Sequence, residues 1–274
     1  MRRRRDSAHP PPLKRFGQHF LADRTVLARI VDALALTGGE TVVEIGPGRG
    51  ALTELLRPRA KRLILIEIDR ALAAGLRERW GGDAGVEVVE GDVLDTDLPH
   101  VAGGPYVLVG NVPYYITTPI VFQSLAPPQP TRSVFLVQRE VAERMAAAPN
   151  SDGYGAMSVN VQVLTRPELL FTVPAGAFRP PPKVESAVVR LTPRAEPLVA
   201  PEDTEPFQGF VQRIFGMRRK QLQRVLRSTH PHLRDVSEML RAHGWDPGAR
   251  PETLSPEEFV RLYRAVTDAD SRSG

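Results

Sequence analysis

The chain has 274 residues, with 36 Lys and Arg against 32 Asp and Glu, and it contains no cysteine. Its apolar content of 42% is ordinary for a globular protein, and its length suits one large domain and one small domain. The absence of cysteine excludes disulfides, zinc–thiolate sites, iron–sulfur clusters, cysteine-ligated deaminases and methylation of cytosine through a cysteine adduct.

The N-terminus begins with a basic run, Met1 to Arg5, but lacks the apolar stretch of a signal peptide. No apolar run approaches the length that spans a membrane. We therefore expect a disordered basic arm over residues 1–13 and a cytoplasmic protein with no membrane partner. The net charge of +4 indicates a nucleic-acid partner only if the cations are clustered.

The first half of the chain alternates between helical and strand patterns. Asp23 suits a helix N-cap, apolar residues at helical spacing follow it to Leu34, and Gly38-Gly39 ends that helix. Further helices are predicted up to residue 56, over 71–80 and up to residue 145, and buried strands at 41–45, 62–68, 86–90, 106–110 and 133–137. This alternation predicts an α/β fold with a parallel, doubly wound sheet.

The second half is less regular. The segment Met157–Leu164 fits either a strand or a buried helix, and residues 193–206 are rich in proline and acidic side chains, which predicts a linker. Closing strands are predicted at 169–173 and 186–191, and helices over 207–215, 235–243 and 256–267. We expect a large domain over 14–195, a linker over 196–206 and a helical domain over 207–274.

A glycine-rich loop, Glu44-Ile-Gly-Pro-Gly-Arg-Gly50, directly follows the first strand. Gly46 and Gly48 let the backbone approach a ligand closely at a helix N-terminus, but with Ala51 they also satisfy the dinucleotide fingerprint. Glu67 ends the second strand about 20 residues later, where an acid binds ribose hydroxyls. These features suit NAD and S-adenosylmethionine equally.

Two further motifs favour the second cofactor. Asp92 follows the third strand, where it suits either an adenine amino group or a turn cap, and Asn111-Val-Pro-Tyr114 follows the fourth. An asparagine carbonyl can accept a hydrogen bond from an exocyclic amine, a proline fixes the backbone carbonyls, and a tyrosine ring can stack on a base. A dehydrogenase does not explain this set, and all four motifs fall where such sheets bind ligands.

With these motifs the chain resembles the small-subunit ribosomal RNA adenine-N6,N6-dimethyltransferases, the kasugamycin-resistance family. The resemblance runs from about Lys14 to about Tyr263. The glycine loop is generic to methyltransferases, whereas the first and the seventh of the matching segments are far more specific. The matching segments are Lys14–Leu21, Val43–Gly50, Ile66–Asp69, Gly91–Asp92, Gly110–Tyr114, Gln138–Val141, Phe178–Ser186 and Arg218–Lys220.

The resemblance implies a Rossmann-like, S-adenosylmethionine-dependent methyltransferase sheet followed by a small all-α C-terminal domain. It also implies roles for single residues. The cofactor would be contacted by Gln18, His19, Leu21, Gly46, Gly48, Glu67, Asp92 and Asn111. The target amine would be bound by Asn111 and the carbonyl of Pro113, and the base would be stacked between Tyr114 and Phe178. Phe178 also suits a core aromatic before a rigid proline run.

Two positions depart from the family pattern. Many relatives carry Asn where this chain has His19, and a Leu is commoner at Val112. The first change bears on the cofactor contact. The second matters little, because only the backbone geometry is required there.

The C-terminal region carries a basic cluster, comprising Arg218, Arg219, Lys220, Arg224 and Arg227. Such a cluster is usually a solvated helix face, but an RNA partner favours phosphate contacts. No metal site is evident in the sequence.

The implied function is dimethylation of two adjacent adenosines near the 3′ end of 16S rRNA, by a monomer that acts on the small ribosomal subunit during its maturation. The alternatives are a non-catalytic RNA-binding assembly factor, a methyltransferase of another rRNA adenine such as the macrolide-resistance enzymes, and a protein glutamine methyltransferase. A nicotinamide dehydrogenase fits least well.

Overall fold

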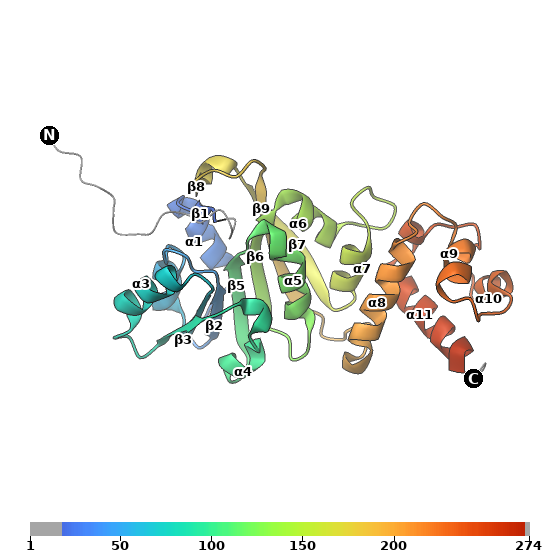
Figure 1. The fold of residues 1–274 in the computed structure, drawn as a ribbon, viewed down its shortest axis with the longest axis horizontal. Coiled ribbons are helices and arrows are strands. Elements are labelled where there is room, and N and C mark those ends of the chain that lie inside the picture. The colour runs from blue at the N-terminus through green and yellow to red at the C-terminus, as the bar shows by residue number, and fades with distance from the viewer. Residues whose placement is uncertain (1–17, 272–274) are drawn as a thin grey trace. The chain divides into compact units, whose positions relative to one another are not determined.

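The computed structural model describes residues 18–271. The predicted arm over residues 1–13 lies outside the described residues, as do Lys14 to Gly17 of the first matching segment. The chain forms two compact units: one contains the chain up to Ala142 together with Glu168–Pro193, and the other contains Glu143–Pro167 and the chain from Arg194 (Figure 1). Within the described residues no helix is long and apolar enough to cross a membrane.

The first unit is organised by a seven-stranded sheet with the order β4-β3-β2-β5-β6-β9-β7. The first five of these strands pair in parallel, as predicted, whereas β9 runs antiparallel to β6. The strands are β2 (Thr41–Ile45), β3 (Arg62–Glu67), β4 (Val86–Glu90), β5 (Tyr106–Asn111), β6 (Arg132–Gln138), β7 (Thr165–Val173) and β9 (Ser186–Pro193).

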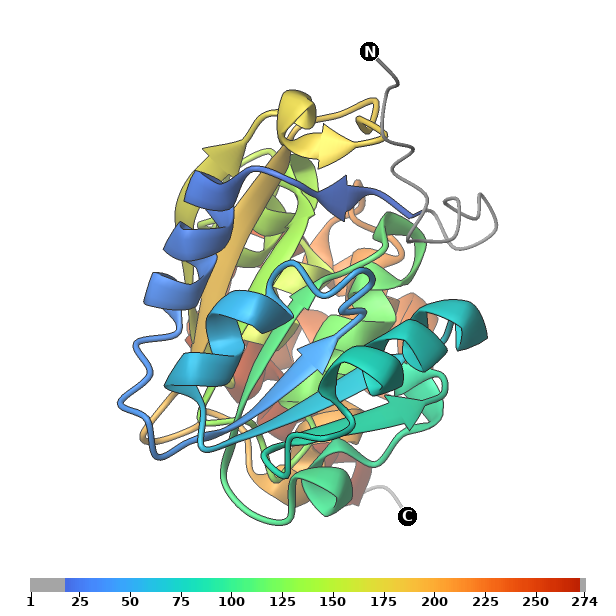
Figure 2. The ribbon, with the colours of Figure 1, turned by 90° about the vertical axis from the view of Figure 1, so that its left-hand side faces the viewer.

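The order of strands reverses between β2 and β5. The chain builds β3 and β4 on one side of β2, then crosses to form β5 and β6 on the other side, with helices on both faces of the sheet (Figure 2). The register pairs Ile45 with Gly110, so the glycine loop after β2 and Asn111 at the end of β5 leave the sheet side by side. In open α/β sheets such a reversal forms the ligand-binding crevice.

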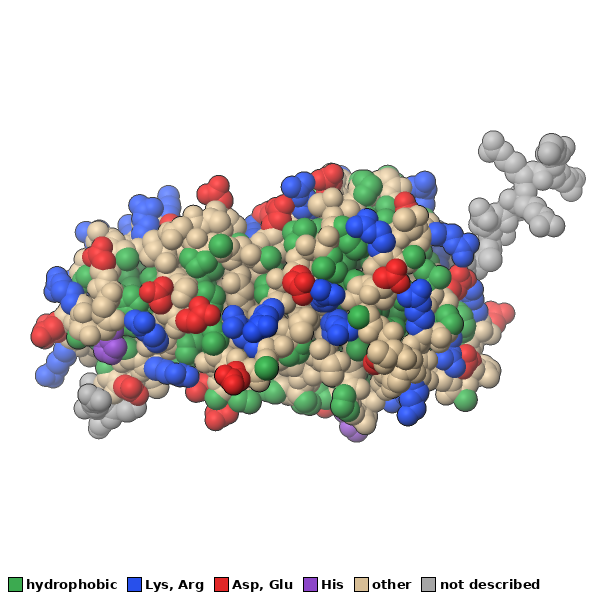
Figure 3. All heavy atoms as spheres, turned by 180° about the vertical axis from the view of Figure 1, so that it is seen from behind, with side chains coloured by type: hydrophobic (Ala, Val, Ile, Leu, Met, Phe, Trp, Pro, Cys, Tyr) green, Lys and Arg blue, Asp and Glu red, His purple; other side chains and the backbone are tan. Residues whose placement is uncertain are grey.

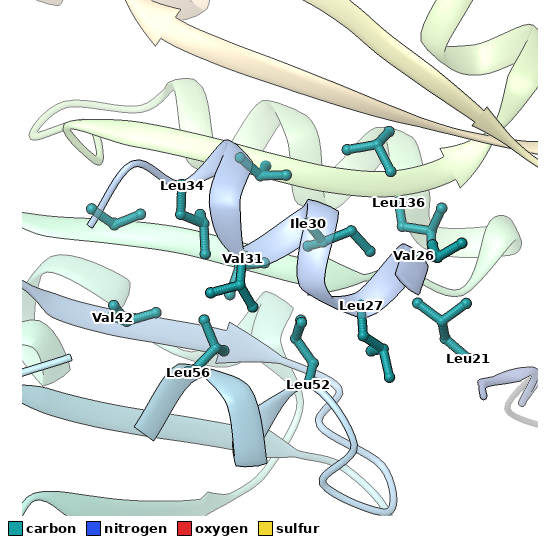
Figure 4. Packing of buried hydrophobic residues seen from close by; sticks show 14 of the residues in the cluster. Leu21, Val26, Leu27, Ile30, Val31, Leu34, Val42, Leu52, Leu56 and Leu136 are labelled. Atoms are coloured by element: carbon teal, nitrogen blue, oxygen red, sulfur yellow. The ribbon is translucent and has the colours of Figure 1, made fainter. Parts of the chain in front are cut away.

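Three helices cover one face of this sheet: α1 (Arg24–Ala33), α2 (Thr53–Leu56) and α3 (Arg70–Trp80). Asp23 caps α1, because its Oδ1 accepts the backbone N–H groups of Thr25 and Val26 at 2.9 and 3.1 Å. The apolar stripe of α1, which includes Ile30 and is continued by the C-cap residue Leu34, packs against Val42 and Leu136 of the sheet (Figure 4). Alternate strand residues face this core, as the pleat requires.

The remaining elements of the first unit are short. A two-stranded sheet pairs β1 (Phe20–Leu21) with β8 (Phe178–Arg179) in antiparallel register, and neither strand was predicted. No helix was expected after Tyr114 either, yet a 3₁₀ turn, η4 (Tyr114–Ile116), leads directly into α5 (Thr117–Leu125). The other helices are η2 (Arg57–Arg59), η3 (Val93–Asp95), α4 (Leu98–Ala102) and η5 (Ala175–Ala177).

The second unit is helical. The ambiguous segment Met157–Leu164 forms a helix, α7, and the next helix, α8, begins at Thr204, within the predicted linker over 196–206. Residues 143–167 group with this unit and not with the predicted domain over 14–195, because α7 packs on α8 and α11. Its helices are α7 (Ala156–Gln162), η6 (Pro201–Asp203), α8 (Thr204–Phe215), α9 (Leu222–Thr229), α10 (Val236–Ala242), η7 (Pro251–Thr253) and α11 (Pro256–Ser271), and α6 (Arg139–Ala146) enters it from the sheet.

Candidate active site

A cavity of about 920 Å³, its open mouth included, lies at the carboxyl ends of the parallel strands of the first unit. Its lining comes from the end of each of β2, β3, β4 and β5 and from the segment around β1, so it occupies the crevice that the strand order creates. The predicted site residues that line it are Gln18, His19, Gly46, Gly48, Glu67, Asp92, Asn111, Pro113 and Tyr114.

The glycine loop takes a backbone course that other residues adopt only at a cost. Gly46 and Gly48 both have left-handed backbones, with φ of 62° and 58°. A Cβ atom added to Gly48 would lie 2.9 Å from the ring of Phe20, so a side chain there would displace that ring. Because the loop carries no side chain at Gly46 and Gly48, its backbone lines the cavity directly.

Glu67 is buried beneath this loop and is already hydrogen bonded. One carboxyl oxygen accepts the backbone N–H of Gly48 at 3.0 Å, and the other accepts that of Asp69 at 2.9 Å. Burial raises the pKa of the Glu67 carboxyl, while these two N–H groups act in the opposite direction. The carboxyl thus ties the glycine loop to the end of β3.

Asp92 presents one oxygen to a neighbour and leaves the other available. Its Oδ1 caps η3 by accepting the backbone N–H of Leu94 at 2.9 Å, and Oδ2 has no hydrogen bond within the described residues. The turn cap and the amino-group acceptor considered for this residue are therefore compatible. A side chain added at the adjacent Gly91 would meet no protein atom within 4 Å, so the cavity beside Asp92 is open.

Asn111 is oriented by a contact far away in the sequence. Its Nδ2 donates to the backbone carbonyl of His19 at 3.0 Å, which identifies the other amide atom as the oxygen. That oxygen, Oδ1, makes no hydrogen bond to any described residue. The contact with His19 therefore fixes the position of Oδ1, which is available as an acceptor.

The carbonyl of Pro113 is less available than the sequence suggests. It accepts the backbone N–H of Ile116 at 3.1 Å and the hydroxyl of Thr117 at 3.3 Å, because the chain turns into η4 and α5 immediately after it. A carbonyl oxygen has two lone pairs, and both are used here. A further amine can bind this oxygen only if the longer bond, to Thr117, is released.

Tyr114 is held by contacts to its hydroxyl and to its ring. Its hydroxyl lies 2.6 Å from the Oγ of Ser186 on β9, and burial raises the pKa of this hydroxyl, so it is neutral at pH 7. The ring of His19 lies nearly parallel to the ring of Tyr114, with centroids 6.1 Å apart. His19 is in turn fixed by a contact of 2.9 Å between its Nδ1 and the backbone oxygen of Pro180.

Two predicted site residues do not line this cavity. Leu21 and Phe178 are paired neighbours in β1 and β8, and both side chains belong to the core beneath α1; Phe178 is only 1% exposed. The alternative considered for Phe178, a core aromatic, agrees with this position. A stacking role would require its ring to leave the core.

Several lining residues were not proposed from the sequence. Phe20 packs on Gly48 and under the guanidinium of Arg49, which lies 4.5 Å from its ring centroid, while Ile68 and Tyr115 lie at the cavity with large exposed fractions. The sequence contains a signal for Ile68 and Tyr115: Ile68 directly follows the site acid Glu67, and Tyr115 directly follows the site residue Tyr114.

A second buried acid lies under the loop, outside this cavity. Glu44 of β2 is 2% exposed, and one of its oxygens accepts the hydroxyl of Thr53 at 2.7 Å. Burial raises the pKa of Glu44 to about 8, and the nearby charge of Glu67 adds to this effect. Glu44 is therefore protonated at neutral pH.

The basic cluster lies in the second unit. Arg218, Arg219 and Lys220 occupy the turn between α8 and α9 and not a helix face, whereas Arg224 and Arg227 lie on α9. Arg218 is engaged with the carboxyl of Glu252 at 3.5 Å and the carbonyl of Asp152 at 3.2 Å, while Arg219, Lys220 and Arg224 are exposed. On the face shown in Figure 3, cationic and anionic side chains are interspersed.

Comparison with known proteins gives consistent results for sequence and structure. The curated relatives include the ribosomal RNA small subunit methyltransferases A of Gloeobacter violaceus, 45% identical over 96% of both chains, and of Acidobacterium capsulatum, 43% identical over 95% of this chain and 92% of the relative. A dimethyladenosine transferase from Plasmodium falciparum superimposes with a TM-score of 0.81 at 25% identity, covering 92% of this chain and 98% of the other.

A further solved structure, the 23S rRNA methyltransferase ErmE, is 33% identical and has a TM-score of 0.70, with 90% of this chain and 99% of the other covered. The family model for ribosomal RNA adenine dimethylases matches residues 13–268, which is nearly the whole chain. The chain therefore belongs to the ribosomal RNA adenine dimethylase family, and it is an S-adenosylmethionine-dependent rRNA adenine methyltransferase.

Proposed function

We propose that this enzyme transfers methyl groups from S-adenosylmethionine to N6 of two adjacent adenosines near the 3′ end of 16S rRNA, and that it does so as a cytoplasmic monomer acting on the small ribosomal subunit during maturation. The curated relatives at 40–45% identity carry the small-subunit name, whereas the 23S enzyme is 33% identical. The observation that carries the chemistry is the orientation of Asn111, a cavity-lining residue whose Nδ2 donates to the His19 carbonyl and whose Oδ1 accepts no hydrogen bond from any described residue.

We assign cofactor binding to one half of the cavity, formed by Gly46, Gly48, Glu67 and Asp92 and called the cofactor half below. The donor set suits the molecule, because Asp92 Oδ2 can accept an adenine amino group and Glu67 can accept ribose hydroxyls. Because both oxygens of Glu67 accept backbone N–H groups, ribose binding replaces or shares one of these bonds. His19 lines the same cavity, and Leu21 anchors the segment that carries His19 by packing into the core.

We assign the target adenine to the other half, formed by Asn111, Pro113 and Tyr114 and called the target half. When bound, S-adenosylmethionine supplies a methyl group on a positively charged sulfur. Adenine N6 is a poor nucleophile because its lone pair is delocalised into the ring. Asn111 Oδ1 would accept one N6 hydrogen and turn the lone pair toward the donor, and the Pro113 carbonyl would accept the second once Thr117 releases it. Such positioning can contribute up to about 7–11 kcal/mol.

The target base must leave its stack before it can enter the cavity. The Tyr114 ring would stack on the base, fixed in place by Ser186. The second stacking contact, predicted for Phe178, requires that ring to turn out of the core as the base enters. Each stacking contact stabilises a bound base by roughly 1–3 kcal/mol.

We assign RNA phosphate contacts in the second unit to the exposed cations Arg219, Lys220 and Arg224. Arg218 contributes less on this proposal, because its guanidinium already contacts Glu252 and Asp152.

The test is to incubate the enzyme with labelled S-adenosylmethionine and small subunits from cells that lack this activity, and to map the modified nucleotides by mass spectrometry. We expect two adjacent dimethyladenosines near the 3′ end of the 16S rRNA. Methylation at another adenine would overturn the substrate assignment, and bound cofactor without transfer would favour the non-catalytic assembly factor.

A further inference from the structure

Tyr115 is an exposed aromatic residue at the cavity that the proposed reaction does not use. Its side chain is 60% exposed, the largest fraction among the exposed large hydrophobic residues within 18–271, and it is the one aromatic ring among them. Single exposed apolar residues are common on protein surfaces. Tyr115 differs because it also lines the cavity that contains Asn111 and Tyr114.

The local backbone separates the two neighbouring tyrosines. Tyr114 and Tyr115 are the first two residues of the 3₁₀ turn η4, in which successive side chains point about 120° apart. The hydroxyl of Tyr114 is anchored on Ser186, whereas that of Tyr115 makes no hydrogen bond to any described residue. One ring is therefore fixed inside the cavity, and the next is presented to solvent at the same cavity.

An RNA substrate creates a need at this position. When a target base turns into a cavity, its neighbour in the strand loses a stacking partner and remains outside. An aromatic ring can replace that partner, because every base has a π-face and the contact is tolerant of sequence. Tyr115 follows directly after Tyr114, so it is well placed to reach the adjacent nucleotide.

We propose that the Tyr115 ring forms a second base site, which stacks on the nucleotide next to the target adenosine while the target occupies the cavity. This inference rests on the proposed function, since it requires an RNA substrate with a base turned out of its stack. The occupant is the base of the adjacent nucleotide, which for a substrate with two neighbouring adenosines includes the other adenosine of the pair.

The first test compares Tyr115→Ala with Tyr115→Phe on unmethylated small subunits, with Leu169→Ala as the control. Leu169 is 38% exposed on β7 of the same unit and does not line the cavity. For Tyr115→Ala we expect a rise of at least about fivefold in KM for the subunits, since one stacked base contributes roughly 1–3 kcal/mol. Tyr115→Phe and Leu169→Ala should behave as the wild type does, and S-adenosylmethionine affinity should be unchanged in all three variants.

The second test identifies the occupant. Small subunits are reconstituted with 16S rRNA in which one adenosine of the pair, on either side in turn, is replaced by an abasic nucleotide, and methylation of the remaining adenosine is followed. The wild type should bind at least one of the two abasic substrates more weakly than it binds the intact substrate. Tyr115→Ala should bind that abasic substrate as well as it binds the intact substrate.

Two results would overturn the inference: an unchanged KM in Tyr115→Ala, or an abasic penalty that is the same in the variant and the wild type. The latter would mean that Tyr115 contacts some other component, such as a ribosomal protein. Failure of the proposed function is recognised separately, because the wild type would then not dimethylate the intact adenosine pair.

Discussion

The two halves of the cavity are built from different kinds of chemical group. The cofactor half uses the carboxyls of Glu67 and Asp92, which also hold the backbone of their own loops. The target half uses an amide, a peptide carbonyl and a neutral phenol, none of which changes charge near pH 7. The comparison teaches that cofactor affinity is coupled to loop structure and protonation, whereas presentation of the amine depends on hydrogen-bond direction alone.

Removal of the fixed acceptor in the target half has the largest expected effect. Asn111→Ala leaves the His19 carbonyl without its donor and the N6 hydrogens without an acceptor. We expect kcat to fall by about 10²–10³-fold, as for the loss of one preorganised polar group elsewhere. Single-turnover methylation at saturating cofactor measures this. Near-normal turnover would rule out the role of Asn111.

A change in the cofactor half should act on a different quantity. In Glu67→Gln, an amide NH₂ replaces one of the two oxygens that accept backbone N–H groups, so one hydrogen bond that holds the glycine loop or the end of β3 is lost. We expect S-adenosylmethionine to bind about 10–100-fold more weakly, with KM for the RNA substrate unchanged.

The matched control is Glu90→Gln. Glu90 pairs with Glu67 in the register of β3 and β4, but it contacts Arg77 at the surface and does not line the cavity. If both variants weaken cofactor binding equally, the carboxyl of Glu67 has no special role.

Protonation of Glu44 couples the loop to pH. In the folded protein its pKa is about 8, against the ordinary value of 4.5, so its stabilising contribution is complete below pH 4.5 and is lost as the pH rises to 8. Over this window the unfolding free energy of the wild type should fall relative to Glu44→Gln by about 1.4 kcal/mol per pH unit. Chemical denaturation at several pH values tests this, and parallel curves for the two proteins would contradict it.

The smallest effect is expected outside both halves. Replacement of Arg219 and Lys220 by Gln should weaken binding to the RNA substrate by about fivefold, and should reduce the slope of log affinity against log salt by about one to two. The control is a double variant in which Gln replaces two other exposed cations, Lys61 in the bend before β3 and Arg166 on β7, so that the same number of charges is removed. Equal slopes in the two double variants would mean that the cluster is a solvated surface and does not contact RNA phosphates.

The sequence predicts much of the cofactor half, because the motifs follow apolar strands and parallel strands bring their carboxyl ends together. Glu67, Asp92 and Asn111 reach the same cavity for this reason. The ambiguous segment that became α7 was decided by packing on other helices, which periodicity cannot show.

What was missed in the target half depends on contacts between distant segments. The amide of Asn111 is oriented by His19, 92 residues away, and Phe178 is buried because β8 pairs with β1. The bonds to the Pro113 carbonyl are an exception, since Ile116 and Thr117 are near in sequence and the start of α5 was not recognised.

The most direct test of the division between the two halves is a calorimetric titration of S-adenosylmethionine into Asn111→Ala, beside the wild type and Glu67→Gln. The account predicts that Asn111→Ala binds the cofactor within about threefold of the wild type, although its methyl transfer is about 10²–10³-fold slower, and that Glu67→Gln binds the cofactor far more weakly. Cofactor binding lost in Asn111→Ala to the same extent as in Glu67→Gln would contradict the division, because Asn111 would then act through the cofactor and not through the target amine.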